Sequence, residues 1–136
     1  MSMVADTLPI TFNAARHFVE RNVDEGRGAR PAFFHGDEVL SYQDVLDAVK
    51  RAARLLSDLG VERENRVAIL LPDCPESVFA FWGALWMGAV PVPINVGYSI
   101  DDIRYILGDT RAKVLVTDEA RAGQRSPASR GACESR

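Results

Sequence analysis

Two glycines, Gly83 and Gly88, have the spacing of the glycine pair in a Walker A phosphate-binding loop. That loop requires a lysine directly after its second glycine, and Ala89 occupies this position. The loop must also lead into a helix, whose N-terminal N–H groups bind phosphate. Here both glycines lie within or at the end of a segment with a helical pattern. We therefore predict that Gly83 serves helix packing, that Gly88 ends the helix, and that neither binds phosphate.

Histidine and cysteine are the next side chains that could do chemistry. His17 and His35 have no second His, Cys or carboxylate at ligand spacing, so we interpret both as surface or rim histidines. Cys74 follows an apolar run in a Pro-rich turn. As a nucleophile it would need a partner base and a positive local field, and the sequence shows neither. The interpretation as a packed, inert thiol is favoured over the catalytic one.

Paired acids and aromatics also have a functional and a structural interpretation. Asp101 and Asp102 could act as an acid/base pair, but adjacent residues of a helix point in different directions. Stabilisation of a helix N-terminus is the favoured role. Trp82 and Trp86, one helical turn apart, could line an aromatic pocket, although core packing is the default. No Ser/His/Asp set, HExxH, CxxC or metal-ligand cluster occurs, so we predict no catalytic, cofactor-binding or metal-binding residue in this chain.

Composition limits the class of protein. The 136 residues carry a net charge of −3, with 47% hydrophobic and 26% charged residues, which suits one modest globular domain. Scattered basic residues argue against a nucleic-acid partner. No apolar run has the length of a membrane span, and the start does not resemble a secretory signal. Cys74 and Cys133 lie far apart in different contexts, so we expect no disulfide and a cytoplasmic protein.

Apolar residues recur at helical spacing in four segments. The first covers residues 12–24, with Asn13 as N-cap and Gly26-Arg27-Gly28 at its end. A second follows Ser41, which with Asp44 forms a capping box, and ends at Gly60 in the left-handed C′ position. The third, residues 76–87, is apolar on nearly every side, which predicts burial within a larger assembly. The fourth follows Ser99 and has the apolar set Ile103, Tyr105, Ile106 and Leu107.

Extended segments alternate with these helices. A hairpin is predicted for residues 32–35 and 38–41 around the turn Gly36-Asp37. Continuous apolar runs predict buried strands at residues 66–71, 90–93 and 113–117. The order helix, strand, helix, strand, helix predicts a layered α/β sheet with right-handed crossovers. From residue 118 on there is no Leu, Ile, Val, Met or aromatic residue, so residues 1–118 are expected to form a partial domain and residues 119–136 a disordered, unrelated tail.

Several ordered motifs resemble the start of the adenylate-forming, AMP-binding enzymes. They are Leu40-Ser41-Tyr42 entering a helix, Arg66-Val67-Ala68-Ile69-Leu70-Leu71-Pro72, and Gly88-Ala89-Val90-Pro91-Val92-Pro93-Ile94-Asn95. The opening Phe12-Asn13-Ala14-Ala15 with Gly26-Arg27-Gly28 is most similar to the benzoate-CoA ligases. The resemblance covers residues 12–118. It implies an incomplete layered α/β subdomain of that fold with a small β-hairpin.

The resemblance also implies a reaction and cofactors. The family joins a carboxylate to ATP as an acyl-adenylate, then transfers the acyl group to CoA, with Mg²⁺ assisting. Its catalytic motifs lie later in the chain: a Ser/Thr/Gly-rich loop ending in Lys, a Tyr-x-Thr-Glu segment, an Asp for the ribose and a Lys in a C-terminal lid. None occurs here, so the matching segments are scaffold and no family residue can be carried over. The tail composition suggests a truncated or frameshifted ligase.

Three functions therefore remain open. The first is the N-terminal part of an AMP-forming aryl-CoA ligase, incompetent alone and active only with a complementing chain that completes the site for an aromatic or other carboxylate. The second is a non-catalytic α/β protein-interaction module. The third is a small-ligand binder that uses Trp82 and Trp86. The apolar helix at residues 76–87 and an unpaired strand edge also predict self-association.

Overall fold

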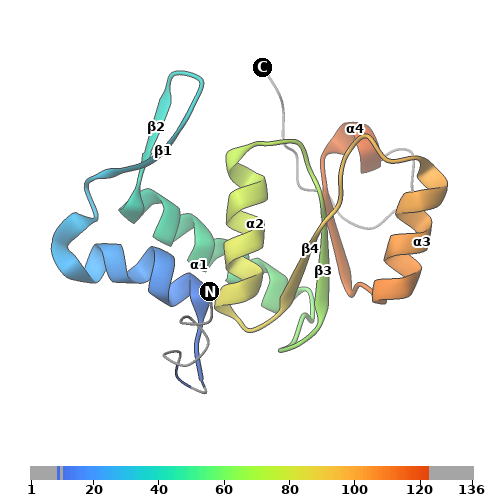
Figure 1. Cartoon of the computed structure of the whole chain (residues 1–136), viewed down its shortest axis with the longest axis horizontal. Coiled ribbons are helices and arrows are strands. Elements are labelled where there is room, and N and C mark those ends of the chain that lie inside the picture. The colour runs from blue at the N-terminus through green and yellow to red at the C-terminus, as the bar shows by residue number, and fades with distance from the viewer. Residues whose placement is uncertain (1–8, 10, 123–136) are drawn as a thin grey trace, which may run out of the picture.

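The structure, a computed structural model, describes residue 9 and residues 11–122. A helical segment comes first and contains η2 (Arg16–Glu20) and η3 (Val23–Arg27). The hairpin strands β1 (Pro31–His35) and β2 (Glu38–Ser41) follow. The remaining elements are α1 (Tyr42–Asp58), β3 (Arg66–Leu70), α2 (Pro75–Trp86), β4 (Val90–Pro93), α3 (Ile100–Thr110), β5 (Val114–Thr117) and α4 (Glu119–Ala122). Strand and helix alternate from β3 onward, which confirms the predicted α/β class (Figure 1).

A three-stranded parallel sheet in the order β4-β3-β5 forms the centre of the molecule. The strand β3 lies in the middle, with Val67 opposite Pro91 on one side and Val114 on the other. Residues 67–70 are buried, because helices cover both faces of this strand. The four consecutive apolar residues from Val67 to Leu70 are what a parallel strand covered on both sides requires, and the sequence predicted this.

The two faces of the sheet have separate cores. Val67 and Ile69 pack with residues of α1 and α2 such as Leu56 and Ala84. On the opposite face Ala68 and Leu70 pack with Ile94 and Ile103, the last of which belongs to α3. Figure 1 shows α1 and α2 on one side of the strands and α3 on the other. The period-two alternation of a strand therefore divides a single apolar run between two cores.

Both long helices end in the same C-terminal motif. In α1, Gly60 has φ of 80°, and the N–H of Val61 donates to Leu56 O at 3.0 Å. In α2, Gly88 has φ of 82°, and the N–H of Ala89 donates to Ala84 O at 2.9 Å. A residue with positive φ and this six-to-one bond define a Schellman motif, which satisfies carbonyls that the helix leaves unpaired. The predicted C′ roles of both glycines are confirmed.

The first helical segment differs from the prediction in its type. Residues 14–27 are helical, but η2 and η3 have π-helical hydrogen bonding and Gly26 has φ of 78° inside η3. A π-helical turn changes the angular step per residue, so the α-helical spacing assigns the wrong face to some side chains. Ala15 and Val19 are buried as expected, whereas Phe18 is 55% exposed.

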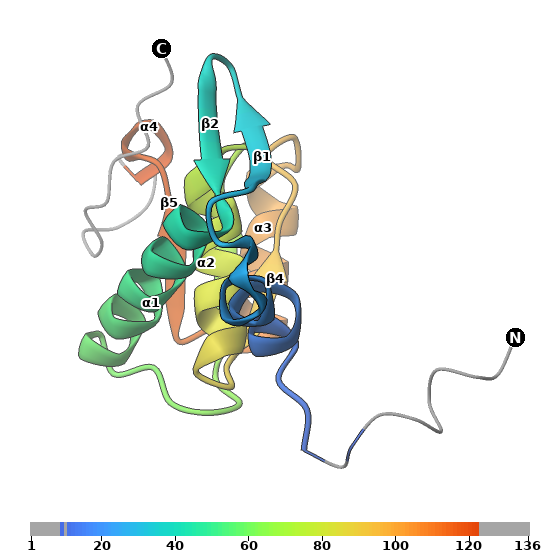
Figure 2. The same cartoon turned by 90° about the vertical axis from the view of Figure 1, so that its left-hand side faces the viewer.

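The β1–β2 hairpin extends away from the rest of the fold (Figure 2). His35 pairs with Glu38 and Phe34 with Val39, around the predicted turn Gly36-Asp37. The side chains of Phe34 and Val39 are 70% and 51% exposed. The hairpin thus displays apolar side chains at its far end.

Burial of other predicted apolar residues is mixed. Leu59 is 50% exposed because it is the C-cap of α1, and Tyr105 is 72% exposed on the outer side of α3. The helix α2 is only partly buried: Pro75, Ala80, Gly83 and Ala84 are its buried residues. The predicted tail begins at residue 119, but residues 119–122 form α4; residues 123–136 lie outside the described part of the chain.

Candidate functional site

A cleft of about 700 Å³ opens where β3 and β4 end and α2 begins. Carboxyl ends of parallel strands are where α/β folds bind ligands, so this cleft is the candidate site. Its walls come from the end of β3, the first half of α2 and the end of β4 with the loop that follows. They are Ile69, Leu71, Pro72, Asp73, Ser77, Val78, Phe81, Trp82, Pro93, Ile94, Asn95 and Val96.

The cleft has few polar groups, and Ser77 and Asn95 use theirs in hydrogen bonds to nearby backbone atoms. The hydroxyl of Ser77 donates to Cys74 O at 2.7 Å. The Oδ1 atom of Asn95 accepts the N–H of Gly97 at 2.8 Å. Asp73 brings a carboxylate to the rim. The described lining is mostly apolar with a few uncharged polar groups and one carboxylate, and it contains no Lys, Arg or His to neutralise phosphate or a carboxylate substrate.

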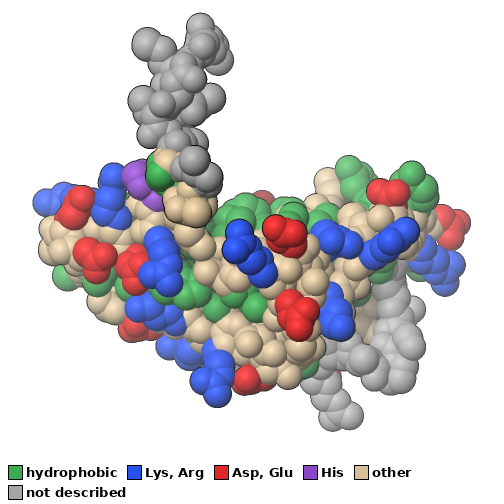
Figure 3. Space-filling view, turned by 90° about the horizontal axis from the view of Figure 1, so that it is seen from below, with side chains coloured by type: hydrophobic (Ala, Val, Ile, Leu, Met, Phe, Trp, Pro, Cys, Tyr) green, Lys and Arg blue, Asp and Glu red, His purple; other side chains and the backbone are tan. Residues whose placement is uncertain are grey.

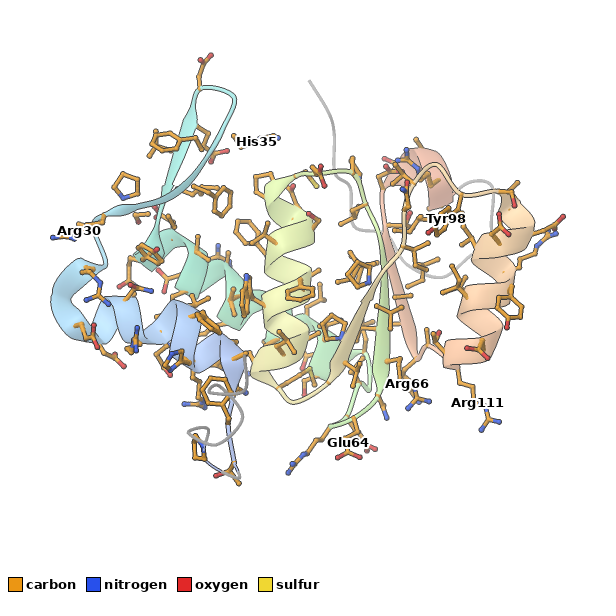
Figure 4. The ribbon with its side chains drawn as sticks, in the orientation of Figure 1. Arg30, His35, Glu64, Arg66, Tyr98 and Arg111 are labelled. Carbon is orange, nitrogen blue, oxygen red and sulfur yellow. The ribbon has the colours of Figure 1, made fainter. Side chains whose placement is uncertain are left out.

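The basic side chains of the elements next to the cleft lie outside it. In Figure 4, Arg66 and Arg111 lie at the amino-terminal ends of the strands, whereas Tyr98 lies beyond the carboxyl end of β4. The Nε–H of Arg66 donates to Thr110 O at 2.6 Å, at the C-terminus of α3, where a cation stabilises the helix dipole. Over the face seen in Figure 3, basic and acidic side chains are mixed and form no single basic patch.

The two glycines of the Walker-like spacing have structural roles, as predicted. A Cβ built on Gly83 would come 2.8 Å from the Cβ of Ala52 and 3.2 Å from Val49 O, so α1 and α2 approach closely at this position. Gly88 belongs to the Schellman motif of α2. Neither glycine lies on a loop that leads into a helix N-terminus, and the chemistry of a phosphate loop is absent from this segment.

The two histidines lie in different parts of the structure. The His17 ring lies between the rings of Phe12 and Phe18, at centroid distances of 5.1 and 4.9 Å. His35 is exposed on the hairpin, as Figure 4 shows. Cys74 is buried at the N-cap of α2. The other cysteine, Cys133, lies outside the described residues, so the expectation that the two form no disulfide stays a prediction.

The adjacent acids of α3 point to different partners. Asp102 accepts a 2.6 Å hydrogen bond from the Ser99 hydroxyl, which in turn accepts the N–H of Asp102 at 3.2 Å. Asp101 pairs with Arg104 at 3.4 Å. The cap at Ser99 is confirmed, and the geometry favours the role of these acids at the helix N-terminus over an acid/base pair.

Trp82 and Trp86 separate into two environments. Trp82 lines the cleft and contacts Phe81 edge to face, with ring centroids 5.4 Å apart. Trp86 instead lies beneath two cations, Arg16 at 4.7 Å and Lys50 at 5.3 Å from its ring centroid. The two indoles therefore do not form one aromatic pocket. Sequence spacing could not separate them, because the cations come from other elements.

The acidic, histidine and cysteine side chains of the described residues are dispersed. Among residues 9 and 11–122 no group of three or more His, Cys, Asp or Glu side chains is arranged to hold a metal ion. The described residues therefore do not fit a Mg²⁺ site of their own. No helix within this range is both long enough and apolar enough to cross a bilayer.

The described residues form an α/β subdomain with a cleft at the carboxyl ends of its parallel strands, and comparison with known proteins identifies the family. Residues 19–135 match the model of the family described as AMP-binding enzyme. The chain belongs to this family. The match extends past residue 118, where the motif resemblance ends.

Individual relatives are acyl- and aryl-CoA ligases. The 4-hydroxybenzoate–CoA/benzoate–CoA ligase of Rhodopseudomonas palustris is 46% identical over 104 residues, which cover 76% of this chain and 19% of the relative. An acetyl-coenzyme A synthetase of Streptomyces avermitilis is 36% identical over 110 residues, covering 77% and 17%. The crystal structure of the anthranilate CoA ligase AuaEII in complex with anthranoyl-AMP superimposes with a TM-score of 0.82 at 31% identity, covering 89% of this chain and 23% of that one. The chain thus spans about a fifth of the length of these proteins.

Proposed function

We propose that this chain is the amino-terminal α/β scaffold of an AMP-forming ligase that joins an aromatic carboxylic acid, benzoate or a hydroxybenzoate, to coenzyme A. The observation that carries the proposal is the 46% identity to a benzoate-class ligase over 104 residues, against 36% to an acetate-activating one. The superposition on an anthranilate ligase supports the aromatic class as well.

The described residues support a scaffold role within that enzyme. The candidate cleft is apolar and has no cation among its described lining residues. Activation of an acid by ATP requires groups that bind a triphosphate and stabilise the charge of phosphoryl transfer. We propose that this chain alone is catalytically incompetent and that ATP, Mg²⁺ and CoA are bound only when a complementing polypeptide supplies those groups. We place the complete enzyme in the cytoplasm.

An ATP–pyrophosphate exchange assay tests the proposal. The purified 136-residue chain is expected to give no exchange with benzoate, 4-hydroxybenzoate or acetate, and calorimetry is expected to detect no saturable ATP binding. Exchange by the chain alone would contradict the incompetence. A polypeptide with the missing four-fifths of a benzoate-class ligase, mixed with this chain, should restore exchange with benzoate in preference to acetate. Preference for acetate would contradict the aromatic class.

A non-catalytic interaction module is the second candidate. The exposed apolar side chains of the hairpin, Phe34 and Val39, support it, because they are paired across the two strands and together present an apolar surface to solvent. The third candidate, a ligand binder, would use Trp82 alone, since Trp86 is covered by cations. Titration with benzoate distinguishes the third from the first two: quenching of tryptophan fluorescence that is lost in Trp82→Phe but kept in Trp86→Phe would establish a binding site in the cleft.

A further inference from the structure

We propose that residues 13–25 form a strap, a unit that opens from α2 about a hinge at Gly26 and that, when closed, holds one wall of the candidate cleft in place. The inference is independent of the ligase chemistry. It follows from the few side chains that the strap buries, from the contacts that it makes with the end of α2, and from the rings that lead from the strap to the cleft.

Little apolar burial holds the strap. Among residues 13–25 only Ala15 and Val19 are buried. Val19 belongs to a core cluster with Val45 and Val49 of α1. Segments with few buried apolar groups open locally at a smaller free-energy cost than the core of the same protein. The strap is therefore expected to open more often than α1 or α2.

The strap makes polar and cationic contacts with the last turn of α2. The helix α2 has no basic residue of its own in that turn. The Asn13 amide donates to Leu85 O and Trp86 O. The Arg16 guanidinium lies 4.7 Å from the centroid of the Trp86 ring. The strap thus supplies the donor and the positive charge that stabilise the C-terminus of a helix.

Glu20 joins these contacts to α1. One oxygen of its carboxylate lies 3.3 Å from Arg16 Nη1 and the other lies 3.9 Å from Lys50 Nζ. Lys50 is the second cation at the Trp86 ring, so this carboxylate offsets the repulsion between the two cations. All three charged side chains are partly exposed, and each ion pair is therefore weak and screened by salt. Such contacts can be released without unfolding the core.

The hinge lies directly after the strap. Gly26 has φ of 78°, and a Cβ built on it would meet nothing within 4 Å. The chain is fixed again two residues later, where Gly28 O accepts the N–H of Gln43 at 2.9 Å, at the start of α1. Glycine adopts positive and negative φ with similar ease, whereas other residues do not. Gly26 can therefore absorb the backbone rotation between the fixed chain and the strap.

A row of rings joins the strap to the cleft. The ring centroid of Phe18 lies 6.2 Å from that of Trp82, and the Trp82 centroid lies 5.4 Å from that of Phe81. Trp82 and Phe81 belong to α2 and line the cleft. Phe18 is thus a positioning residue, because the closed strap supports an indole of the cleft wall. A molecule bound against Trp82 would in turn favour the closed strap, since coupling between two sites is reciprocal.

Hydrogen exchange of the full 136-residue chain, resolved into peptides by mass spectrometry, tests the opening. Residues 13–25 should exchange faster than residues 75–86. Gly26→Ala should increase the exchange rate of residues 13–25 about fivefold, because the closed strap requires positive φ at this position. Gly36→Ala is the matched control. Gly36 also has positive φ and space for a Cβ, but it lies in the hairpin turn, so this rate should stay within about twofold.

The same measurement tests the charged contacts. Arg16→Gln should increase the exchange rate of residues 13–25 about fivefold, since the cation at the Trp86 ring is lost. Arg54→Gln removes an ion pair of the same i,i+4 spacing, to Asp58 at 3.1 Å on α1, and should change the rate by less than about twofold. Exchange of residues 13–25 that is no faster than that of α2, or equal effects of each variant and its control, overturns the proposal.

A combined variant tests the link to the cleft. It removes three contacts of the closed strap at once: Asn13→Ala, Arg16→Gln and Phe18→Ala. Trp82 becomes the sole tryptophan when Trp86→Phe is added. Acrylamide should quench its fluorescence more strongly in the combined variant than in Trp86→Phe alone, while the chain still unfolds cooperatively in urea. Phe34→Ala, which truncates an exposed side chain of the hairpin, should leave the quenching unchanged. Unchanged quenching in the combined variant contradicts the link to the cleft, and loss of cooperative unfolding shows that the strap is no separate unit.

Discussion

Gly83 of α2 lies directly against Ala52 of α1. A Cβ at position 83 would be 2.8 Å from the Ala52 Cβ, and 3.0 Å from the backbone nitrogen of Ala53. Two of these three nearest atoms, counting Val49 O at 3.2 Å, belong to the backbone and cannot move aside as a flexible side chain would. The absence of a side chain at Gly83 therefore sets how closely the two helices pack.

Gly83→Ala should destabilise the fold by about 1–2 kcal/mol, because the cost of overpacking exceeds the gain in helix propensity. The matched control is Gly108→Ala in α3, where a new Cβ would meet nothing within 4 Å. This control should gain up to about 1 kcal/mol. Urea unfolding followed by circular dichroism measures both. Equal effects of the two variants would show that the helices can separate without cost.

Asn13 joins the first helical segment to the end of α2. Its side-chain amide donates to Leu85 O at 2.9 Å and Trp86 O at 3.1 Å, while its Oδ1 accepts the N–H of Arg16 at 3.2 Å. Asn13→Ala should cost about 1–3 kcal/mol, because α2 carbonyls lose their donors. Asn13→Asp keeps the predicted cap but places a negative charge beside those carbonyls. If Asn13→Asp is as stable as the unchanged chain in urea unfolding, the hydrogen bonds from Asn13 to α2 contribute nothing to the free energy of unfolding.

The capping box of α1 gives the stability a pH dependence. The hydroxyl and the backbone N–H of Ser41 donate to Asp44 at 2.5 and 2.9 Å, and they hold the pKa of that carboxyl below its ordinary value of 3.8. A carboxyl whose pKa is lower in the folded protein than in the unfolded chain stabilises the folded state at pH values above its unfolded pKa. This stabilisation is lost as the pH falls through the folded-state pKa. Asp44→Asn should therefore be less stable than the natural chain at neutral pH, and the difference in Tm should shrink in acid. A difference that stays constant with pH would contradict the carboxylate's role. Ser41→Ala should cost about 1 kcal/mol at neutral pH.

The hydroxyl of Thr117, at the end of β5, is buried and has no hydrogen-bond partner within the described part of the chain. Thr117→Val keeps the shape and removes the unpaired polar atom, so it should be neutral or stabilise by up to about 1 kcal/mol. Thr110→Val is the control: its hydroxyl donates to Ile106 O at 2.7 Å, and its loss should destabilise by about 1 kcal/mol. Destabilisation by Thr117→Val in thermal unfolding would reveal a partner for this hydroxyl.

Local sequence signals predicted much of the fold. The hairpin turn at Gly36, the caps at Ser41 and Ser99, and the left-handed positions Gly60 and Gly88 all depend on residues within a few positions of one another. The β3 run predicted a strand covered on both faces for the same reason. Each of these features is confirmed, since the chemistry that determines it is short-range.

Features that depend on distant contacts were harder to predict. The π-helical turns displace Phe18 from the face that α-helical spacing assigns to it, and Tyr105 was placed on an apolar face from which it points away. The cleft could not be inferred because Trp82 meets Pro93 and Val96 only after β3 and β4 have paired. The separation of Trp82 from Trp86 likewise depends on Arg16, which is far away in the sequence.

The hydrogen bonds of Asn13 join it to two residues that lie 72 and 73 positions further along the sequence. During synthesis on a ribosome, the first helical segment emerges well before α2 and has no carbonyls to bind until α2 has also left the exit tunnel. The amino-terminal segment therefore docks on α2 only after α2 has formed. Formation of the Asn13 hydrogen bonds thus marks a late step in folding, after the helices that cover the sheet are in place.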